Sequence, residues 1–144
     1  MRVEKNIVVE RPIETVFAFL TDMHKVKLWL PIDNIRQTSS GPIGVGSTFA
    51  QEAQFLGQRF ATTSEVTRYE PPHVFALKMV QGPLPLTNSM HCEPTETGGT
   101  KITMVGETDL GPAVKLMGPL IVPLIQKQLD TQINLLKQAL ETQA

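Results

Sequence analysis

The stretch LIQKQLDTQINLLKQALE, from Leu124 to Glu141, has the apolar spacing of a long amphipathic helix. Its apolar residues repeat at steps of four, four, three and four and form one narrow stripe, namely Ile125, Leu129, Ile133, Leu136 and Leu140. A helix with such a stripe has to bury it against another element. The only predicted partner large enough is a β-sheet built from the middle of the chain, so the helix has to pack on that sheet.

The middle of the chain, from Ile32 to Asp109, alternates strand-like runs with short turn clusters. The Gly57-Gln58 pair is short enough for a hairpin, and Pro71-Pro72 ends the run before it, because two prolines cannot continue a ladder. Six runs joined by short connections predict an antiparallel meander. The runs are IDNIRQT, TFAQEAQFL, RFATTSEVTRY, HVFALKMV, LTNSMHCEP and TKITMVGETDL.

The amino-terminal part adds one strand and two short helices. The run VEKNIVVE predicts the strand, and Pro12 suits the first turn of a helix whose apolar stripe is Ile13, Val16, Phe17 and Leu20. A second short helix is expected over Met23–Leu30, stopped by Pro31. Ahead of the last helix, Pro112 to Met117 is expected to form a turn or two, and Gly118, Pro119 and Pro123 to interrupt it. The predicted class is α+β: a curved, antiparallel, seven-stranded sheet wrapped around a long C-terminal helix.

Length and composition narrow the classes of function. The 144 residues suit a single domain, residues 1–144, and the formal net charge of −1 gives no basic excess for nucleic acid. One cysteine excludes an internal disulfide. The start lacks the apolar core of a signal peptide, and prolines, glycines and a lysine break the apolar stretch Leu110 to Ile125. We therefore expect a soluble, cytoplasmic protein without membrane insertion.

The order of elements and several local motifs resemble those of the SRPBCC superfamily, which has the helix-grip fold. It includes the START lipid-transfer domains, the birch-pollen-allergen-like proteins and the polyketide cyclase/dehydrase family. The resemblance covers nearly the whole chain and implies an apolar ligand held between the sheet and the last helix. It is carried by the opening strand, RPIETVFAFLTD (11–22), KLWLP (27–31), GVGSTF (44–49), EVTRYEPPHVFAL (65–77), EPTETGGTKITM (93–104) and the terminal helix.

The stretch His91-Cys92-Glu93 contains the residue types of a thiol nucleophile, its base and an orienting carboxylate. On a strand, however, neighbouring side chains point to opposite faces. Cys92 is then expected to point inward and His91 and Glu93 outward, so no catalytic residue is predicted. His24, His73 and His91 lie in different predicted elements without ligand spacing, and neither a metal nor a cofactor is expected.

Strand alternation and the resemblance together give a list of expected cavity residues. Alternation selects the inward face of each strand, and the resemblance puts Trp29 at the cavity mouth. Several of these residues are small or polar, and the methionines offer adaptable apolar walls. The expected ligand-binding residues are Trp29, Phe49, Phe60, Thr62, Ser64, Phe75, Leu77, Met79, Asn88, Met90, Cys92, Met104, Met117, Leu120, Leu124 and Gln128.

Three functions remain open from the sequence. The first is binding or transport of a small hydrophobic molecule of lipid, polyketide or isoprenoid type, without chemistry. The second is a polyketide cyclase or dehydratase, for which Arg59, Tyr69 and Glu107 are the candidate polar groups. The third is a protein-interaction module using the apolar residues Val114, Leu116, Met117 and 120–122, which could equally form a lid. A homodimer is compatible with the sequence.

Overall fold

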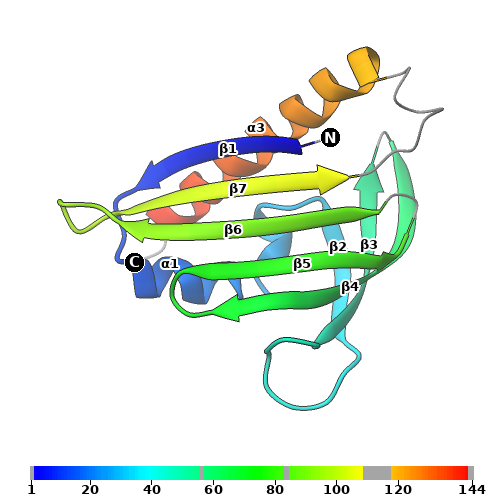
Figure 1. Cartoon of the computed structure of the whole chain (residues 1–144), viewed down its shortest axis with the longest axis horizontal. Helices are drawn as coiled ribbons and strands as arrows, with labels where there is room; N and C mark the ends of the chain where they lie inside the picture. Colours follow the sequence, from blue (N-terminus) through cyan, green and yellow to red (C-terminus); the bar gives the residue numbers. More distant parts are fainter. Residues whose placement is uncertain (1, 56, 83–84, 109–117, 143–144) are drawn as a thin grey trace.

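The computed structural model describes residues 2–55, 57–82, 85–108 and 118–142. Its element order is the predicted one: a strand, two short helical segments, six strands and a long helix (Figure 1). The bounds are β1 Arg2–Val9, α1 Ile13–Leu20, η1 Val26–Leu28, β2 Ile32–Gln37, β3 Thr48–Phe55, β4 Gln58–Glu70, β5 Val74–Gln81, β6 Leu86–Pro94, β7 Thr100–Thr108 and α3 Gly118–Thr142.

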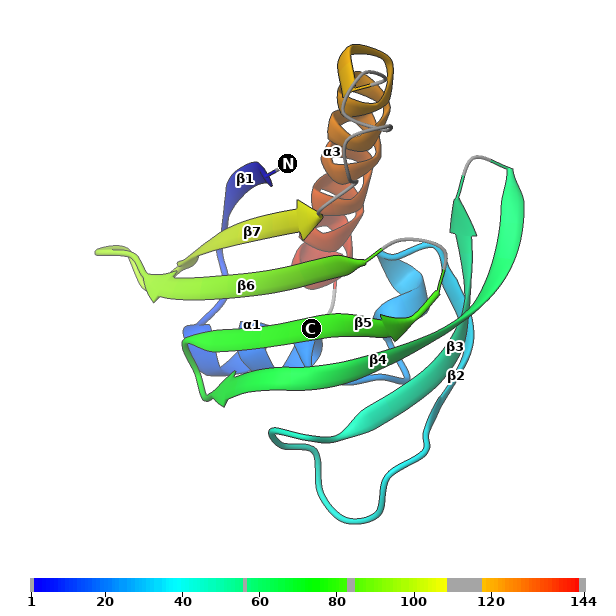
Figure 2. The same cartoon turned by 45° about the vertical axis from the view of Figure 1, so that its right-hand side comes forward.

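The described strands form one seven-stranded sheet in the order β1-β7-β6-β5-β4-β3-β2, with every neighbouring pair antiparallel. The first strand of the chain is therefore an edge strand and pairs with the last one, and β2 is the other edge. The sheet curves, and α1 and α3 lie on its concave side, with α3 packed against β1 (Figures 1 and 2). The predicted curved sheet around a long C-terminal helix is confirmed.

Helix α1 begins one residue later than its proline. Pro12 has an extended conformation as the N-cap, and its carbonyl accepts the Val16 N–H at 3.0 Å. The predicted stripe of this helix is buried at Val16, Phe17 and Leu20, whereas Ile13 is half-buried. The hydroxyl of Thr21 donates to the Phe17 carbonyl at 2.9 Å, which satisfies one acceptor at the end of the helix.

The predicted second helix, Met23–Leu30, is only a 3₁₀ turn at Val26–Leu28. Asp22 explains the late start, because its side chain accepts the His24 N–H at 3.0 Å and its carbonyl accepts the Lys25 N–H at 3.0 Å. These bonds form a local turn that competes with helix formation. Trp29 follows this turn, with its backbone N–H on the Val26 carbonyl and its side chain 1% exposed.

Helix α3 begins at Gly118 rather than at the predicted Leu124, and Pro123 lies inside it. Because proline has no N–H, Pro123 removes one backbone hydrogen bond from the helix. The expected turn over Pro112–Met117 lies outside the described residues. The predicted stripe of α3 is buried at Leu129, Ile133, Leu136 and Leu140, and Ile125 is half-buried.

One end of the space between the sheet and α3 is filled with apolar side chains, and we call it the packed end. Its residues include Val9, Cys92, Ile102, Leu136 and Leu140, each at most 2% exposed. Register places Cys92 opposite Ile102, and Ile102 opposite Ile7 of β1. An aromatic group from α1, β4 and β5 packs beside it, with ring centroids 5.7 to 6.5 Å apart for Phe17, Tyr69 and Phe75.

Candidate functional site

The opposite end of the same interior is hollow and holds a cavity of about 210 Å³. It is surrounded by the inner face of β3 to β7, the segment of η1 and β2, and the middle of α3, and Val3 of β1 and Leu20 of α1 also line it. Paired residues on β6 and β7 show where the cavity ends and the packed end begins. In β6 and β7 the cavity touches Asn88, Gly106 and Met90, while the paired residues Cys92 and Ile102 lie beyond it.

Many of the expected residues line this cavity. Trp29 lines it at the end of η1, and Gln128 lines it from α3. The inner faces of the strands contribute alternate residues, which is why alternation could identify them. The expected residues in the wall are Trp29, Phe49, Phe60, Thr62, Ser64, Phe75, Leu77, Met79, Asn88, Met90 and Gln128.

Four other expected residues lie elsewhere. Cys92 and Met104 do point inward, but they lie in the apolar core and not in the cavity wall. Leu120 and Leu124 are 71% and 49% exposed, because the first turns of α3 extend beyond the sheet (Figure 2). Ile125 and Leu129 take the position expected for Leu124. Met117 lies outside the described residues.

The expected list omitted most of the wall contributed by the segment between α1 and β3. Three of the missing residues, Met23, Val26 and Leu30, follow one another at steps of three and four. This helical spacing is the signal that could have identified them. The missing residues of this segment flank Trp29 in the sequence and are Met23, Val26, Leu30, Pro31, Ile32 and Ile35.

The described lining contains no aspartate, glutamate, lysine, arginine, histidine, tyrosine or cysteine. Its polar groups are amides, hydroxyls and the Trp29 indole. The Gln51 amide donates to the Ser64 hydroxyl at 3.1 Å, and both residues are buried. The Trp29 Nε1 and the Thr62 Oγ1 are buried without a hydrogen-bond partner among the described residues. The described wall therefore carries no charged group.

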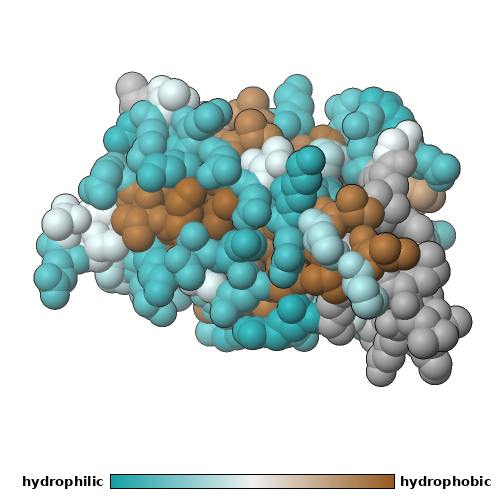
Figure 3. Space-filling view, turned by 90° about the horizontal axis from the view of Figure 1, so that it is seen from above, coloured by the Kyte–Doolittle hydropathy of each residue, from teal (hydrophilic) through white to brown (hydrophobic). Residues whose placement is uncertain are grey.

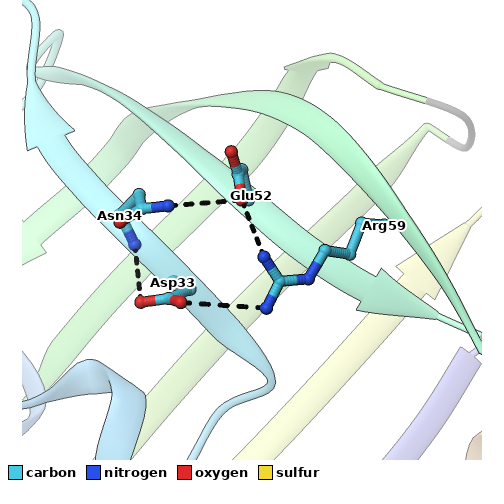
Figure 4. A network of polar contacts seen from close by, with 4 residues as sticks. All are labelled: Asp33, Asn34, Glu52 and Arg59. Atoms are coloured by element: carbon cyan, nitrogen blue, oxygen red, sulfur yellow. Dashed lines mark hydrogen bonds and ion pairs between the residues drawn. The ribbon is translucent and has the colours of Figure 1, made fainter.

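The residues considered for catalysis lie away from the cavity. Arg59 belongs to an exposed network on the outer face of the sheet, 3.2 Å from Glu52 and 3.9 Å from Asp33 (Figure 4). Asn34, in a left-handed conformation at a bulge of β2, donates to Glu52 at 3.3 Å. Glu107 faces outward and lies 3.4 Å from Arg2, so the glycine before it does not turn it inward.

The neighbouring residues His91 and Cys92 lie on opposite faces of β6, as alternation predicts. The His91 Nε2 lies 3.1 Å from the Ser89 hydroxyl, while the Cys92 side chain is 1% exposed in the core. Burial raises the pKa of the Cys92 thiol to about 12, because the thiolate would lose its hydration. Cys92 therefore stays protonated at neutral pH, and the neighbouring His91 points to the other face of β6 and cannot serve as its base.

The surface near the start of α3 is partly apolar. Seen from above, apolar areas alternate with hydrophilic residues (Figure 3). Leu120 and Leu124 contribute exposed apolar side chains to α3, whereas Val114, Leu116 and Met117 lie outside the described residues. Within the described residues, no helix has the length and apolar character needed to cross a membrane.

Comparison with solved structures finds the same fold at low sequence identity. A START superfamily protein from Mycobacterium smegmatis is 18% identical with a TM-score of 0.80, each chain covering 97% of the other. A protein from Thermus thermophilus is 14% identical with a TM-score of 0.80, again over 97% of both chains. An aromatase/cyclase from a Streptomyces species is 13% identical with a TM-score of 0.79, over 98% of this chain and 93% of that one.

A search of the curated proteins finds no match. The family model described as polyketide cyclase / dehydrase and lipid transport matches residues 1–141. This match and the structural neighbours confirm the resemblance inferred from the sequence motifs. Since the match spans nearly the whole chain, the protein belongs to the polyketide cyclase / dehydrase and lipid transport family.

Proposed function

We propose that the protein binds one small, neutral, largely apolar molecule in the cavity and carries or senses it without changing it chemically. The observation that supports this most is the absence of ionisable side chains from the described lining. A charged ligand would lose its hydration in this wall and gain no opposite charge in return. An uncharged molecule loses far less hydration and gains the burial of its apolar surface.

The volume of the cavity limits the size of the part of the ligand that it can enclose. Its volume of about 210 Å³ lies below the ~300–1,000 Å³ that is typical of drug-sized pockets. An engineered apolar cavity of about 150 Å³ in another protein holds benzene. The enclosed part of the ligand is therefore comparable to one ring with a small substituent, or to a short branched chain. This size is smaller than the whole of an aromatic polyketide or a membrane lipid.

The expected affinity is modest. Burying about 200 Å² of apolar ligand surface at ~25 cal/mol/Å² contributes roughly 5 kcal/mol before association costs. Hydrogen bonds and a preformed cavity offset part of those costs. We therefore expect dissociation constants of roughly 1 mM or weaker for one-ring compounds, and tighter binding for the physiological ligand.

A cyclase or dehydratase reaction is the less favoured alternative. The solved aromatase/cyclase supports it only through a common fold, and a fold does not determine a reaction. Such chemistry needs an acid or base positioned at the substrate. Arg59, Tyr69 and Glu107, the candidate groups, do not line the cavity. The described wall therefore favours binding over chemistry.

A cavity-filling variant tests this function. Ala53 lines the cavity, and Ala50 lies on the opposite face of the same strand. Isothermal titration of the full chain with neutral one-ring compounds should give saturable, one-to-one binding. We expect Ala53→Phe to weaken this binding at least tenfold and the matched control Ala50→Phe to leave it within twofold. Equal binding by both variants, or no binding by the wild type and no small molecule extracted from it, would refute the proposal.

A further inference from the structure

The buried side-chain amide of Gln51 carries a more specific inference, which rests on the proposed function. Gln51 belongs to β3, is 8% exposed and lines the cavity. The other amides of the described lining are half-buried or exposed and belong to Gln54, Asn88, Gln128 and Gln132. Burying an amide in a largely apolar wall is unfavourable unless hydrogen bonds replace its hydration. The hydrogen bonds that Gln51 leaves unmade therefore bear on what the cavity holds.

One hydrogen bond orients this amide. The Gln51 Nε2 donates to the Ser64 Oγ at 3.1 Å, and Ser64 is 6% exposed on the neighbouring strand β4. The register brings the two side chains together, because Gln51 pairs with Thr62, and Ser64 follows two residues later on the same face of β4. A glutamine amide has two N–H donors and an oxygen with two lone pairs. Only one of these is used among the described residues.

The oxygen of the same amide is open. The Gln51 Oε1 has no hydrogen bond to a described residue, and the protein does not enclose it completely, in contrast to the Trp29 Nε1 and the Thr62 Oγ1. Because the Gln51 side chain lines the cavity, a molecule inside the cavity can reach this oxygen. An amide oxygen only accepts hydrogen bonds, so its partner has to be a donor.

We propose that the ligand carries a hydroxyl or N–H group that donates a hydrogen bond to the Gln51 Oε1, so that Gln51 determines ligand specificity. The ligand is then a neutral alcohol, phenol or amide. A hydrocarbon or a ketone can fill the cavity, but neither offers a donor to this oxygen. A carboxylate offers none either, and its charge would be buried without a counter-ion in the described wall.

Three probes of nearly the same shape test this inference: benzamide, acetophenone and the hydrocarbon α-methylstyrene. They have the same number of non-hydrogen atoms, but only benzamide can donate a hydrogen bond. Affinities are measured by NMR titration of the full chain, which is suited to millimolar dissociation constants. Gln51→Met replaces the amide by an apolar side chain of similar length, and the matched control Gln58→Met makes the same exchange at an exposed position of β4. The hydrocarbon is the internal reference for changes in packing.

We expect Gln51→Met to weaken benzamide binding by about two- to tenfold relative to α-methylstyrene, which is the range of one neutral hydrogen bond. The affinity for acetophenone relative to α-methylstyrene should stay within about twofold, and Gln58→Met should change none of the three affinities by more than that. The wild type gives a second readout that needs no variant. Bound benzamide should move the side-chain carbonyl ¹³C signal of Gln51 downfield, and bound acetophenone should not.

Three outcomes would overturn the inference. If Gln51→Met weakens acetophenone as much as benzamide, the amide donates to the ligand instead of accepting from it. If the variant changes all three affinities by the same factor and the carbonyl signal does not move with benzamide, Gln51 only shapes the wall, although the binding function stands. If no probe binds the wild type, the proposed function fails together with the inference.

Discussion

The two ends of the interior are built from the same strands and the same helix, yet they differ in what fills them. At the packed end, β6, β7 and α3 contribute Cys92, Ile102 and Leu136, and the space between them is closed. At the cavity end, the same three elements contribute Asn88, Gly106 and Gln128, and a space of about 210 Å³ remains. At these positions, the apolar side chains of the packed end give way to polar side chains or glycine at the cavity end. The packed end provides stability, and the cavity end gives up packing and leaves the space in which we propose that a ligand binds.

The largest expected effect comes from truncating a leucine at each end. Leu136→Ala should lower the free energy of unfolding by about 2–5 kcal/mol, because the side chain is 0% exposed and leaves a new void. Leu77→Ala should cost less than half as much, because Leu77 is half-buried and already borders the cavity. Urea unfolding of both variants measures the difference. Equal losses would contradict the distinction between the two ends.

Enlarging a side chain at each end should give the same contrast, with the larger loss of stability at the packed end. Val9→Phe should lower the free energy of unfolding by about 1–3 kcal/mol or more, because the packed end has no space for it. Ala53→Phe should change it by less than about 1 kcal/mol, because the added ring enters the cavity. Thermal unfolding of the two variants and of the wild type measures these two changes in stability. A loss at Ala53 as large as that at Val9 would mean that the cavity end is also filled.

Alkaline pH should lower the stability of the folded chain, because the Cys92 thiol is buried in the packed end. Its thiol keeps its proton in the folded chain up to a pKa of about 12, whereas the ordinary value is 9.0. This contribution to stability is complete below pH 9 and is lost as the pH rises toward 12, because only the unfolded chain ionises in that window. At pH 10 the loss should be roughly 1 kcal/mol.

Urea unfolding at pH 8 and pH 10 isolates this effect when the wild type is compared with Cys92→Ala. The difference in stability between the two proteins should shrink by that amount at the higher pH. A difference that stays constant would show that the thiol ionises equally well in the folded chain, which a packed core does not allow.

The smallest effect is expected outside the interior. Arg59 belongs to the exposed network with Asp33 and Glu52, and such surface ion pairs contribute about 0–1 kcal/mol. Arg59→Ala should therefore change the unfolding midpoint little and leave the affinity for acetophenone within twofold. A tenfold loss of affinity would move the functional site from the cavity toward this outer face.

The sequence was sufficient to predict the fold because its signals are local. The stripe of α3 and the alternation of β3 to β7 identify which face of each element is inward. The expected cavity residues on these strands, between Phe49 and Met90, line the cavity as that alternation predicts. It was not sufficient to locate the boundary between the two ends. Alternation assigns Cys92 and Met104 to the inner face, but only the position of α3 along the strands determines whether an inner residue meets a void or another side chain.

The same limit applies to the residues around Trp29. The resemblance carried in part by KLWLP implied that this tryptophan would lie at the cavity mouth. The absence of a partner for its indole N–H, among the described residues, depends on every neighbouring element and has no local signal. Leu124 was misplaced for a related reason, because the stripe of α3 does not indicate how far the helix extends beyond the sheet.

The most direct test of the central claim uses the methionines as reporters of the two ends. Met23, Met79 and Met90 line the cavity, whereas Met104 is buried outside it. With methyl-¹³C-methionine in the full chain, titration with acetophenone should shift the methyl signals of the three cavity methionines saturably. The signal of Met104, which pairs with Met90 across β6 and β7 but does not line the cavity, should shift less than theirs. No saturable shift at the three cavity methionines, or a shift at Met104 as large as theirs, would contradict the claim that a ligand enters this cavity and stops at the packed end.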